Sequence, residues 1–399
     1  MRKQKIVFQA YLRQNLLGID VQEILKIYHQ LAFLWYSDQF ALRVSTFHAT
    51  LCMSLLLSQA QAVLVRGGGV KLSYSMFNKK YTDSITIGNI LATWEQFLRG
   101  KKQRKDVMLF QSNLTENISE LFLELRNQTY MHGSYVAFNV SDPKPRIIHK
   151  ALVRDRVVHH LIYKTLYFYF DERFIHDSYS CRKEKGTHRA LDRFNTFARK
   201  SSQNYTRTCY VLKCDIRKFF ANIDHGVLIQ ILQRHIADKD MLWLIEQVIQ
   251  SFCSGVEGVG LPLGNLTSQL LVNVYMHEFD MYVKQELKVK YYIRYADDFV
   301  ILSDSKTRLE NLLVKIDLFL NQKLHLSLHK DKTYIKTYAS GIDFLGWIHF
   351  PRYRQLRTST KRRVMKNMRY YPKPETINSY RGILNHGNTH NLKKEMGLV

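Results

Sequence analysis

Residues 291–302 read YYIRYADDFVIL and constrain the fold more than any other stretch of the chain. The segments 291–295 and 299–302 are rich in aromatic and β-branched residues, which are typical of strands. Asp297 and Asp298 lie between them, and Asp is common in turns because its side chain hydrogen-bonds nearby backbone. The sequence therefore predicts a β-hairpin. On this stretch alone two interpretations stay open: turn-forming acids, or oxygen ligands for a divalent cation.

A metal site needs a third acid, because two adjacent carboxylates repel each other unless positive charge lies between them. Residues 210–220, YVLKCDIRKFF, place Asp215 near the end of a short predicted strand. An exposed Asp, or one paired with Arg217 or Lys218, is the alternative interpretation. If this strand end lies beside the hairpin, three carboxylates can hold two Mg²⁺ about 4 Å apart and align an attacking hydroxyl with a leaving pyrophosphate.

The charge balance of the chain indicates a polyanionic partner. Lys and Arg number 59 against 34 Asp and Glu, a formal net charge of +25. Nucleic acid is the partner that such an excess favours, ahead of an anionic membrane surface. The hydrophobic fraction of 46% excludes a wholly disordered protein.

Cysteine usage and hydropathy indicate a cytoplasmic protein. The cysteines number five and form no CxxC pair, so neither a disulfide framework nor a zinc site is expected, and a reducing compartment fits best. The N-terminus carries no long apolar run, so no signal peptide is expected. The most apolar window, residues 49–65, is shorter than a membrane span and contains Gln and Ser, which predicts a buried helix.

The chain divides into a helical beginning and a mixed remainder. Residues 1–84 form a predicted helical extension, with apolar positions at helical spacing between residues 24 and 35. From residue 130, strand-like segments alternate with helical ones, which predicts an α+β fold. Neither GxxxxGK[ST] nor GxGxxG after a strand occurs, so nucleotide binding through those loops is not expected.

Several segments together resemble one enzyme family. The palm and early thumb of reverse transcriptases are similar, in the same order, to KCDIRKFF (213–220), GLPLGNLTSQ (260–269), RYADDFVIL (294–302), HLSLHKDKTYI (325–335) and DFLGWIHF (343–350). Their fingers resemble DPKPRIIHKALVRDRVVHH (142–160) and DSYSCRKEKGTHRALDRF (177–194). Within the superfamily the chain is most similar to bacterial enzymes of diversity-generating retroelements and to defence-associated (antiphage) reverse transcriptases.

The resemblance implies a right-hand polymerase architecture of the α+β class. Fingers are expected over residues 85–209, and a palm with inserted finger or helical segments over 210–345. A basic helical thumb is expected over 346–399, after the helical N-terminal extension of 1–84. That extension is a candidate for self-association or for docking an accessory protein or a structured RNA.

The implied activity is RNA-directed DNA polymerisation. Asp215, Asp297 and Asp298 match the metal-binding triad, with the Ile216 carbonyl as a further ligand. The implied cofactor is two Mg²⁺ ions, with Mn²⁺ as a possible substitute. Lys332 matches a lysine that protonates the departing pyrophosphate, although Lys330 and a plain surface role are alternatives.

Another set of residues is implied to bind the nucleotide. Lys144 and Arg146 lie on a turn stiffened by two prolines and would grip the triphosphate. Phe220 would pack under the sugar and reject a 2′-hydroxyl, whereas Phe219 is expected in the core. Leu263 and Gln269 stand where many relatives have Gln and Pro. An apolar side chain at Leu263 removes a polar contact and predicts low fidelity.

The nucleic-acid contacts are implied to come from a basic turn, the primer grip and the thumb. The residues are Arg182, Lys183, Lys185, Leu345, Gly346, Lys361, Arg362 and Arg363. The implied partners are an RNA template, in particular a structured noncoding RNA, together with the DNA product and dNTPs. Thr267 or Ser268 is expected to cap the following helix. Asp155 is interpreted as a helix-start residue, and His159 is assigned no role.

Two sequence features bear on the biological role. Ala296, where retroelement enzymes usually have Met, and the helical extension both favour antiphage defence over retroelement diversification. An RNA-directed RNA polymerase is a further alternative. A non-catalytic RNA-binding scaffold is another, but such a binder has no need of three clustered acids facing a polyanion.

Overall fold

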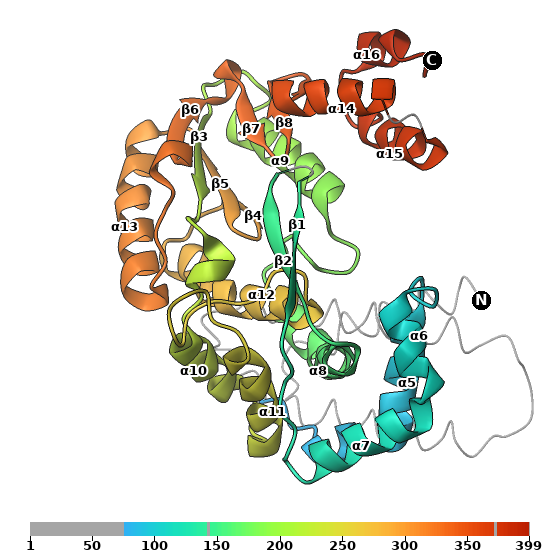
Figure 1. The fold of residues 1–399 in the computed structure, drawn as a ribbon. Helices are drawn as coiled ribbons and strands as arrows, with labels where there is room; N and C mark the ends of the chain where they lie inside the picture. Colours follow the sequence, from blue (N-terminus) through green and yellow to red (C-terminus); the bar gives the residue numbers. More distant parts are fainter. Residues whose placement is uncertain (1–75, 142–143, 371–372, 399) are drawn as a thin grey trace, which may run out of the picture. The chain divides into compact units, whose positions relative to one another are not determined.

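The computed structural model describes residues 76–141, 144–370 and 373–398 (Figure 1). The predicted extension therefore lies mostly outside the described residues. Phe77 and Tyr81 are already buried parts of the main compact unit. The Phe77 amide donates to the His235 carbonyl at 2.7 Å, and the Tyr81 hydroxyl donates to the Leu125 carbonyl at 2.7 Å. The body therefore begins before residue 85, because these two aromatic side chains anchor the segment.

The first helices of the body pack around one long helix. Helix α5 buries Ile90, Trp94 and Phe97 at helical spacing, and the Thr86 side chain caps it by accepting from the Asn89 amide. This apolar face packs against α8. The helices of this part are α4 (Tyr81–Ser84), α5 (Ile87–Leu98), α6 (Lys105–Ser112), α7 (Leu114–Arg126), α8 (Val153–Asp171) and α9 (Thr187–Ser201).

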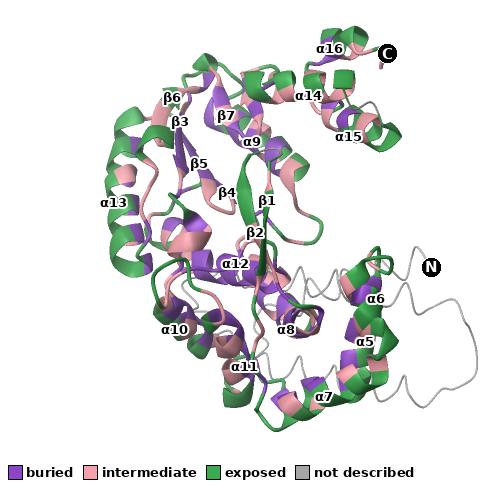
Figure 2. Cartoon of the chain, in the orientation of Figure 1, coloured by how far each residue is buried: buried purple, intermediate pink, exposed green. Residues whose placement is uncertain are grey.

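A two-stranded hairpin comes before α8. Strand β1 (Val136–Val140) pairs antiparallel with β2 (Arg146–Lys150), and its side chains are largely exposed. Figure 2 shows β1 as a mostly exposed ribbon in front of buried elements. Two paired strands bury little surface by themselves, so the hairpin depends on neighbouring segments for its position.

The central sheet has the strand order β4-β5-β3-β6, with antiparallel neighbours throughout. Successive side chains on a strand point to opposite faces. On β5, Phe299 and Ile301 accordingly enter one hydrophobic core, while Val300 and Leu302 enter a second. The strands are β3 (Tyr210–Asp215), β4 (Tyr291–Tyr295), β5 (Asp298–Ser303) and β6 (Tyr334–Thr337).

Different helices cover the two faces of this sheet. Helix α13 (Lys306–Leu324) buries Leu309, Ile316 and Leu320 in the first core, and it flanks the sheet in Figure 1. Helix α12 (Leu266–Met281) also belongs to this core and is buried on all sides, as expected for an interior helix. Helix α9 and the C-terminal strands supply the second core.

The remaining elements are helical turns, further helices and a second, smaller sheet. A 3₁₀ turn (Phe219–Asn222) follows β3, and a π turn (Tyr282–Glu286) extends α12. The other helices are α10 (His225–His235), α11 (Lys239–Gln250), α14 (Thr358–Tyr370), α15 (Pro374–Leu384) and α16 (His390–Glu395). A small sheet of order β7-β8-β9 contains β7 (Ile342–Phe344), β8 (Trp347–His349) and β9 (Arg354–Leu356).

The predicted mixture of strands and helices after residue 130 is confirmed. The hairpin over 291–302 forms as β4 and β5, and the segment after Asp155 is helical. In the part of the chain that the structure describes, no helix has both the length and the apolar character to cross a membrane.

Candidate active site

Strand pairing brings the three candidate metal ligands to one corner of the central sheet. Asp215 ends β3 and is the antiparallel partner of Asp298, which begins β5. Directly opposed residues in such a pair have Cα atoms about 4.5–5.5 Å apart. The Ile216 amide donates to the Asp297 carbonyl at 3.1 Å. Acids more than 80 positions apart in the chain therefore meet.

The turn differs in detail from the sequence prediction. Only Ala296 and Asp297 lie between the paired residues Tyr295 and Asp298, so Asp298 is a strand residue and not a turn residue. Ala296 has φ of 56°, the left-handed conformation that two-residue hairpin turns demand. Strand pairing extends one residue further than expected because Asp298 faces Asp215 across the ladder.

Lysines neutralise two of the three carboxylates. The Lys213 ammonium lies 3.0 Å from Asp298 Oδ1, and the Lys332 ammonium lies 2.9 Å from Asp215 Oδ1. Lys213 is buried, and a buried ammonium is costly without such a partner. The pairing places Lys332 at the acid cluster, as its predicted role requires.

Burial and mutual repulsion raise the pKa values of Asp297 and Asp298. Burial raises the pKa of Asp298 to about 6, with Asp297 and Asp215 acting in the same direction and Lys213 opposing them. Burial and then the Asp215 charge raise the pKa of Asp297, against the charges of Arg146 and Lys332. A cation between these groups would relieve the repulsion.

The donor chemistry of this corner fits a hard divalent cation, because carboxylate oxygens are the ligands that Mg²⁺ prefers. Among the described residues, however, no three His, Cys, Asp or Glu side chains form a ready-made ligand group. The carboxylates of Asp215 and Asp298 are turned to their lysines instead. Holding a metal here therefore requires at least that these carboxylates turn away from their lysines.

The basic turn between β1 and β2 lies within electrostatic reach of the acids. Arg146 begins β2 and is exposed, and its charge favours the ionised form of Asp297 by lowering its pKa. Lys144 is exposed just before β2. Arg146 is therefore near the acids, while Lys144 makes no hydrogen bond or ion pair with another described residue.

The two phenylalanines after β3 differ in exposure. Phe219 is 3% exposed and belongs to the core, as predicted. Phe220 is only partly buried, and its carbonyl accepts a hydrogen bond of 2.7 Å from the Leu261 amide. Phe220 packs against the core without being fully buried, which is compatible with its predicted role beneath a sugar.

The loop at residues 260–265 holds the β1–β2 hairpin. The Leu263 carbonyl accepts from the His149 amide at 3.0 Å, and the Asn265 side-chain amide donates to the His149 carbonyl at 2.9 Å. Gly264 has φ of +106°, and a Cβ there would lie 2.6 Å from Ile148 Cγ2. Glycine is thus needed both for the backbone conformation and for the close approach of β2.

The start of α12 corrects the predicted helix cap. The helix begins at Leu266, so Asn265 and not Thr267 or Ser268 occupies the N-cap position. The Asn265 side chain bonds β2 and does not cap the helix. Gln269 is partly buried on the first turns of α12.

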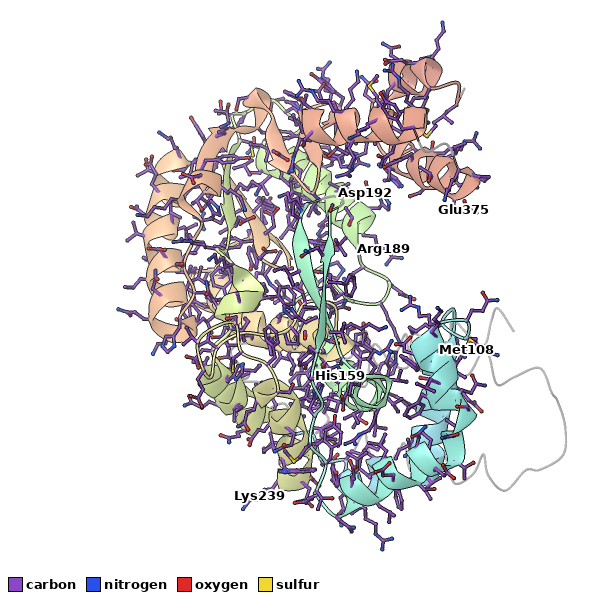
Figure 3. All side chains as sticks on the ribbon, in the orientation of Figure 1. Met108, His159, Arg189, Asp192, Lys239 and Glu375 are labelled. Atoms are coloured by element: carbon purple, nitrogen blue, oxygen red, sulfur yellow. The ribbon has the colours of Figure 1, made fainter. Side chains whose placement is uncertain are left out.

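Thr267 instead joins a buried polar chain. Its hydroxyl lies 3.2 Å from His159 Nδ1, and His159 Nε2 lies 3.0 Å from His132 Nε2. His159, labelled on α8 in Figure 3, thus has partners that the sequence did not reveal. Burial lowers its pKa well below the usual value, so the ring is neutral. Asp155 is also buried and accepts from the Tyr130 hydroxyl at 2.7 Å, a structural role.

One residue of the basic turn at 182–185 is not available to nucleic acid. The Arg182 guanidinium donates to the Asp171 carboxylate at 2.7 Å and to the Ile175 carbonyl at 2.7 Å, and its side chain is 6% exposed. The prediction for Arg182 is therefore wrong, because its charge holds together the segment after α8. Lys183 is exposed with its ammonium 4.6 Å from the Phe168 ring centre, and the Lys185 ammonium donates to the His176 carbonyl.

The predicted primer grip is a tight turn. Leu345 and Gly346 both have positive φ, 51° and 85°, and they connect β7 to β8. The Gly346 carbonyl accepts from the Arg357 amide at 3.0 Å, which ties the turn to the start of α14. Lys361 and Arg362 are exposed on α14, and Arg363 on the same helix is partly buried.

Two neighbours of the acids escaped the sequence analysis. Lys213 lies two residues before Asp215 on a strand, so the two-residue period alone places both side chains on one face. Arg294 lies two residues before Ala296 and is fully buried. Its many contacts come from distant segments and had no local signal.

The antiparallel sheet, the buried α12 and the acids at the sheet corner make up the palm of a right-hand polymerase. Residues 141–349, more than half of the chain, match the family described as reverse transcriptase (RNA-dependent DNA polymerase). The chain belongs to this reverse transcriptase family. The expected right-hand α+β architecture is thereby confirmed for the described residues, and divalent-metal chemistry follows as a general property of the family.

Individual relatives are similar at low identity. Protein YkfC of Escherichia coli (strain K12) is 26% identical over 245 residues, 52% of this chain and 63% of that protein. The group II intron-encoded protein LtrA of Lactococcus lactis subsp. cremoris is 22% identical, over 58% of this chain and 49% of that protein. The putative COX1/OXI3 intron 2 protein of Saccharomyces cerevisiae is 22% identical, over 54% of this chain and 30% of that protein.

Solved structures also resemble the chain. An apo telomerase from Candida tropicalis has a TM-score of 0.43 and 13% identity, covering 55% of this chain and 53% of that chain. A telomerase from Candida albicans has a TM-score of 0.44 and 11% identity, covering 62% of this chain and 51% of that chain.

Proposed function

We propose that the protein is an RNA-directed DNA polymerase that extends a primer with dNTPs. The juxtaposition of Asp215, Asp297 and Asp298 at one corner of the sheet, in a chain of the reverse transcriptase family, carries this proposal. The proposed divisions are a helical extension over 1–84, fingers over 85–209, palm over 210–345 and thumb over 346–399.

The reaction joins the primer 3′-oxygen to the α-phosphorus of the dNTP and breaks the bond to pyrophosphate. When bound, a pair of Mg²⁺ ions, or Mn²⁺ in their place, would lower the pKa of the 3′-hydroxyl and neutralise triphosphate charge. Asp215, Asp297 and Asp298 would hold these ions, with the Ile216 carbonyl as a further ligand.

The chain's own residues would complete the site. Arg146, with Lys144 beside it, binds the triphosphate, and Phe220 contacts the sugar so that a 2′-hydroxyl clashes. Gln269 and Leu263 lie near the base. Lys332, on Asp215, donates a proton to the leaving pyrophosphate.

The nucleic acid would bind across the C-terminal part. The Leu345–Gly346 turn approaches the primer backbone closely, since glycine leaves room there. Lys361, Arg362 and Arg363 on α14 contact phosphates of the duplex. Lys183 and Lys185 contact the template.

The biological role is the finer part of the proposal. We propose that the template is a dedicated, structured noncoding RNA copied in antiphage defence, on the basis of Ala296 and the predicted helical extension. Residues 1–84 would bind an accessory protein or another copy of the chain. The alternative is error-prone copying in a diversity-generating retroelement. A cytoplasmic location stays a prediction.

Primer extension on an RNA template tests the activity. Asp297→Asn should reduce incorporation of labelled dNTPs at least 1,000-fold while RNA binding stays within about threefold. Asp331→Asn, an exposed acid one residue before Lys332, is the matched control and should retain activity. If the wild-type protein and Asp297→Asn bind RNA equally and neither extends the primer, the result favours a non-catalytic RNA-binding scaffold.

Sequencing of the copurifying nucleic acid tests the role. A noncoding RNA with complementary DNA supports defence. A mutated copy of a neighbouring gene segment supports diversification and contradicts the defence proposal.

A further inference from the structure

Arg294 on β4 is buried and uses all of its side-chain N–H donors in hydrogen bonds. Both Arg294 and Asp280 are 0% exposed, and their pairing is bidentate: Nε donates to Oδ1 at 2.8 Å and Nη2 to Oδ2 at 2.6 Å. Nη2 also donates to Ser178 Oγ at 3.2 Å, and Nη1 donates to Asn273 Oδ1 at 3.2 Å and to the Ala296 carbonyl at 3.2 Å. An arginine has five N–H donors, and each one here has an acceptor.

These partners belong to different parts of the fold. Asp280 and Asn273 lie on α12, and Ser178 lies in the segment between α8 and α9. The Asn273 side chain also donates to the Ser180 carbonyl at 3.0 Å. The guanidinium therefore joins a buried helix, a connecting segment and the catalytic turn.

The backbone of Arg294 is fixed as well. Its amide donates to the Asp177 carbonyl at 3.0 Å, and its carbonyl accepts from the Tyr179 amide at 2.9 Å. Asp177 in turn pairs with Arg193 on α9 at 2.7 Å. Because hydrogen bonds hold both the backbone and the side chain of Arg294, its guanidinium is a fixed donor for the groups that it contacts, including the Ala296 carbonyl.

The contact with Ala296 is the one that bears on catalysis. The Ala296 carbonyl belongs to the peptide that leads directly into Asp297. Ala296 has φ of 56°, which a residue with a Cβ adopts only at a cost. A bond from a fixed buried donor to this carbonyl restricts how that peptide can rotate.

We propose that Arg294, held by Asp280, is a positioning residue that fixes the Ala296–Asp297 peptide and so aims the Asp297 carboxylate. It touches no substrate and acts only through the turn. The inference rests on the proposed polymerase function for its effect on rate, but not for its effect on the turn.

Arg294→Lys is the first test. Lysine keeps the charge beside Asp280 but lacks the planar fork that also reaches Ala296. A catalytic group displaced by about 1 Å can cost about 100-fold in rate. We expect kcat for dNTP incorporation to fall about 100-fold, with KM for dNTP within about threefold.

Tyr292→Phe is the matched control. The Tyr292 hydroxyl donates to Asp280 Oδ1 at 2.7 Å, the oxygen that also accepts from Arg294 Nε. Tyr292 has no side-chain hydrogen bond to the turn at Ala296 and Asp297. This variant should lose thermal stability, because it removes a buried bond from the same carboxylate, and yet keep kcat within about threefold. A kcat loss in Tyr292→Phe equal to that in Arg294→Lys would reduce Arg294 to a general structural role and overturn the proposal.

Hydrogen–deuterium exchange of the full-length protein without nucleic acid provides a readout apart from activity. The peptide covering residues 295–298 should exchange about 10-fold faster in Arg294→Lys and at the wild-type rate in Tyr292→Phe. If Arg294→Lys does not fold, Asp280→Asn replaces it, with an expected 10-fold loss of kcat and the same faster exchange. If Arg294→Lys or Asp280→Asn folds and its residues 295–298 exchange at the wild-type rate, the inference is refuted. This outcome holds even if the protein shows no polymerase activity in the assay.

Discussion

The β1–β2 hairpin and the β3–β5 strand pair use similar residues in opposite environments. Val136 and Ile147 of the hairpin are 56% and 55% exposed, whereas Val300 and Ile301 of β5 are 0% and 1% exposed. Both pairs are antiparallel, and both lead to charged groups of the candidate site. The acids thus stand on strands fixed by two cores, while the basic hairpin is held by individual contacts: with the loop at 260–265, with Asp106 through Lys150 at 2.7 Å, and with Phe252 through the His149 ring.

The difference teaches how the two halves of the site are positioned. The acid corner is set by packing throughout the body, so a local change there perturbs the whole fold. The hairpin meets the loop through His149, Gly264 and Asn265, so a change in this loop should move mainly the hairpin. Stability and substrate binding should therefore respond separately to substitution in the two regions.

The largest expected effect is on stability in the sheet. Ile301→Ala should lower the free energy of unfolding by about 3–4 kcal/mol, because it leaves a cavity in a close-packed core. Ile147→Ala, the same change on the exposed hairpin, should alter it by less than about 0.5 kcal/mol. Urea denaturation followed by circular dichroism measures both. Similar losses of unfolding free energy in Ile301→Ala and Ile147→Ala would show that the sheet and the hairpin do not differ in their contribution to stability.

The next effect is on sugar selection beside the sheet corner. Phe220→Ala should raise the relative incorporation of ribonucleotides about 10- to 100-fold, because the ring that would exclude a 2′-hydroxyl is gone. Phe220→Tyr keeps the ring and should retain discrimination. Competition between dNTP and rNTP in primer extension measures the ratio. Unchanged selectivity in Phe220→Ala would place the ring in a purely structural role.

A smaller effect should separate the hairpin from the core. Gly264→Ala puts a Cβ 2.6 Å from Ile148, so the hairpin must shift and KM for dNTP should rise about 10-fold. Gly255→Ala has a similar φ of +95° but open space around the added Cβ. It should share the backbone strain and leave KM unchanged. Steady-state kinetics measures KM for dNTP in both variants. Equal KM values in Gly264→Ala and Gly255→Ala would mean that the position of the hairpin does not affect nucleotide binding.

The smallest expected effect concerns fidelity. Leu263→Gln adds a polar side chain in the loop that holds the hairpin, and it should lower the misincorporation rate by a few-fold. Sequencing of products copied from a defined RNA template measures the error rate. An unchanged rate would mean that the apolar residue does not relax base selection.

Much of the local structure was predictable from short-range patterns. Strands 291–295 and 299–302 follow from β-branched and aromatic residues, and Asp155, expected at a helix start, lies in the first turn of α8. Phe219 as a core residue was correct. Each of these depends on the period of neighbouring side chains, which any short window of sequence contains.

The errors fall where distant segments meet. Asp298 was expected in a turn and lies on a strand because Asp215 pairs with it across the ladder. Arg182 was expected on nucleic acid and is held by Asp171. Asn265, not Thr267, occupies the N-cap position of α12, and the Thr267 hydroxyl lies 3.2 Å from His159 Nδ1 inside the fold.

The sequence alone determined the set of strands and helices, the excess of positive charge and the identity of the acids. These properties are local or compositional, so they need no knowledge of the chain's path. Tertiary structure alone decided that Lys213 and Lys332 neutralise two of the acids and that Arg294 holds the turn before the third. Buried charges take their partners from whatever the fold places beside them, and that choice is not written in any one stretch of the chain.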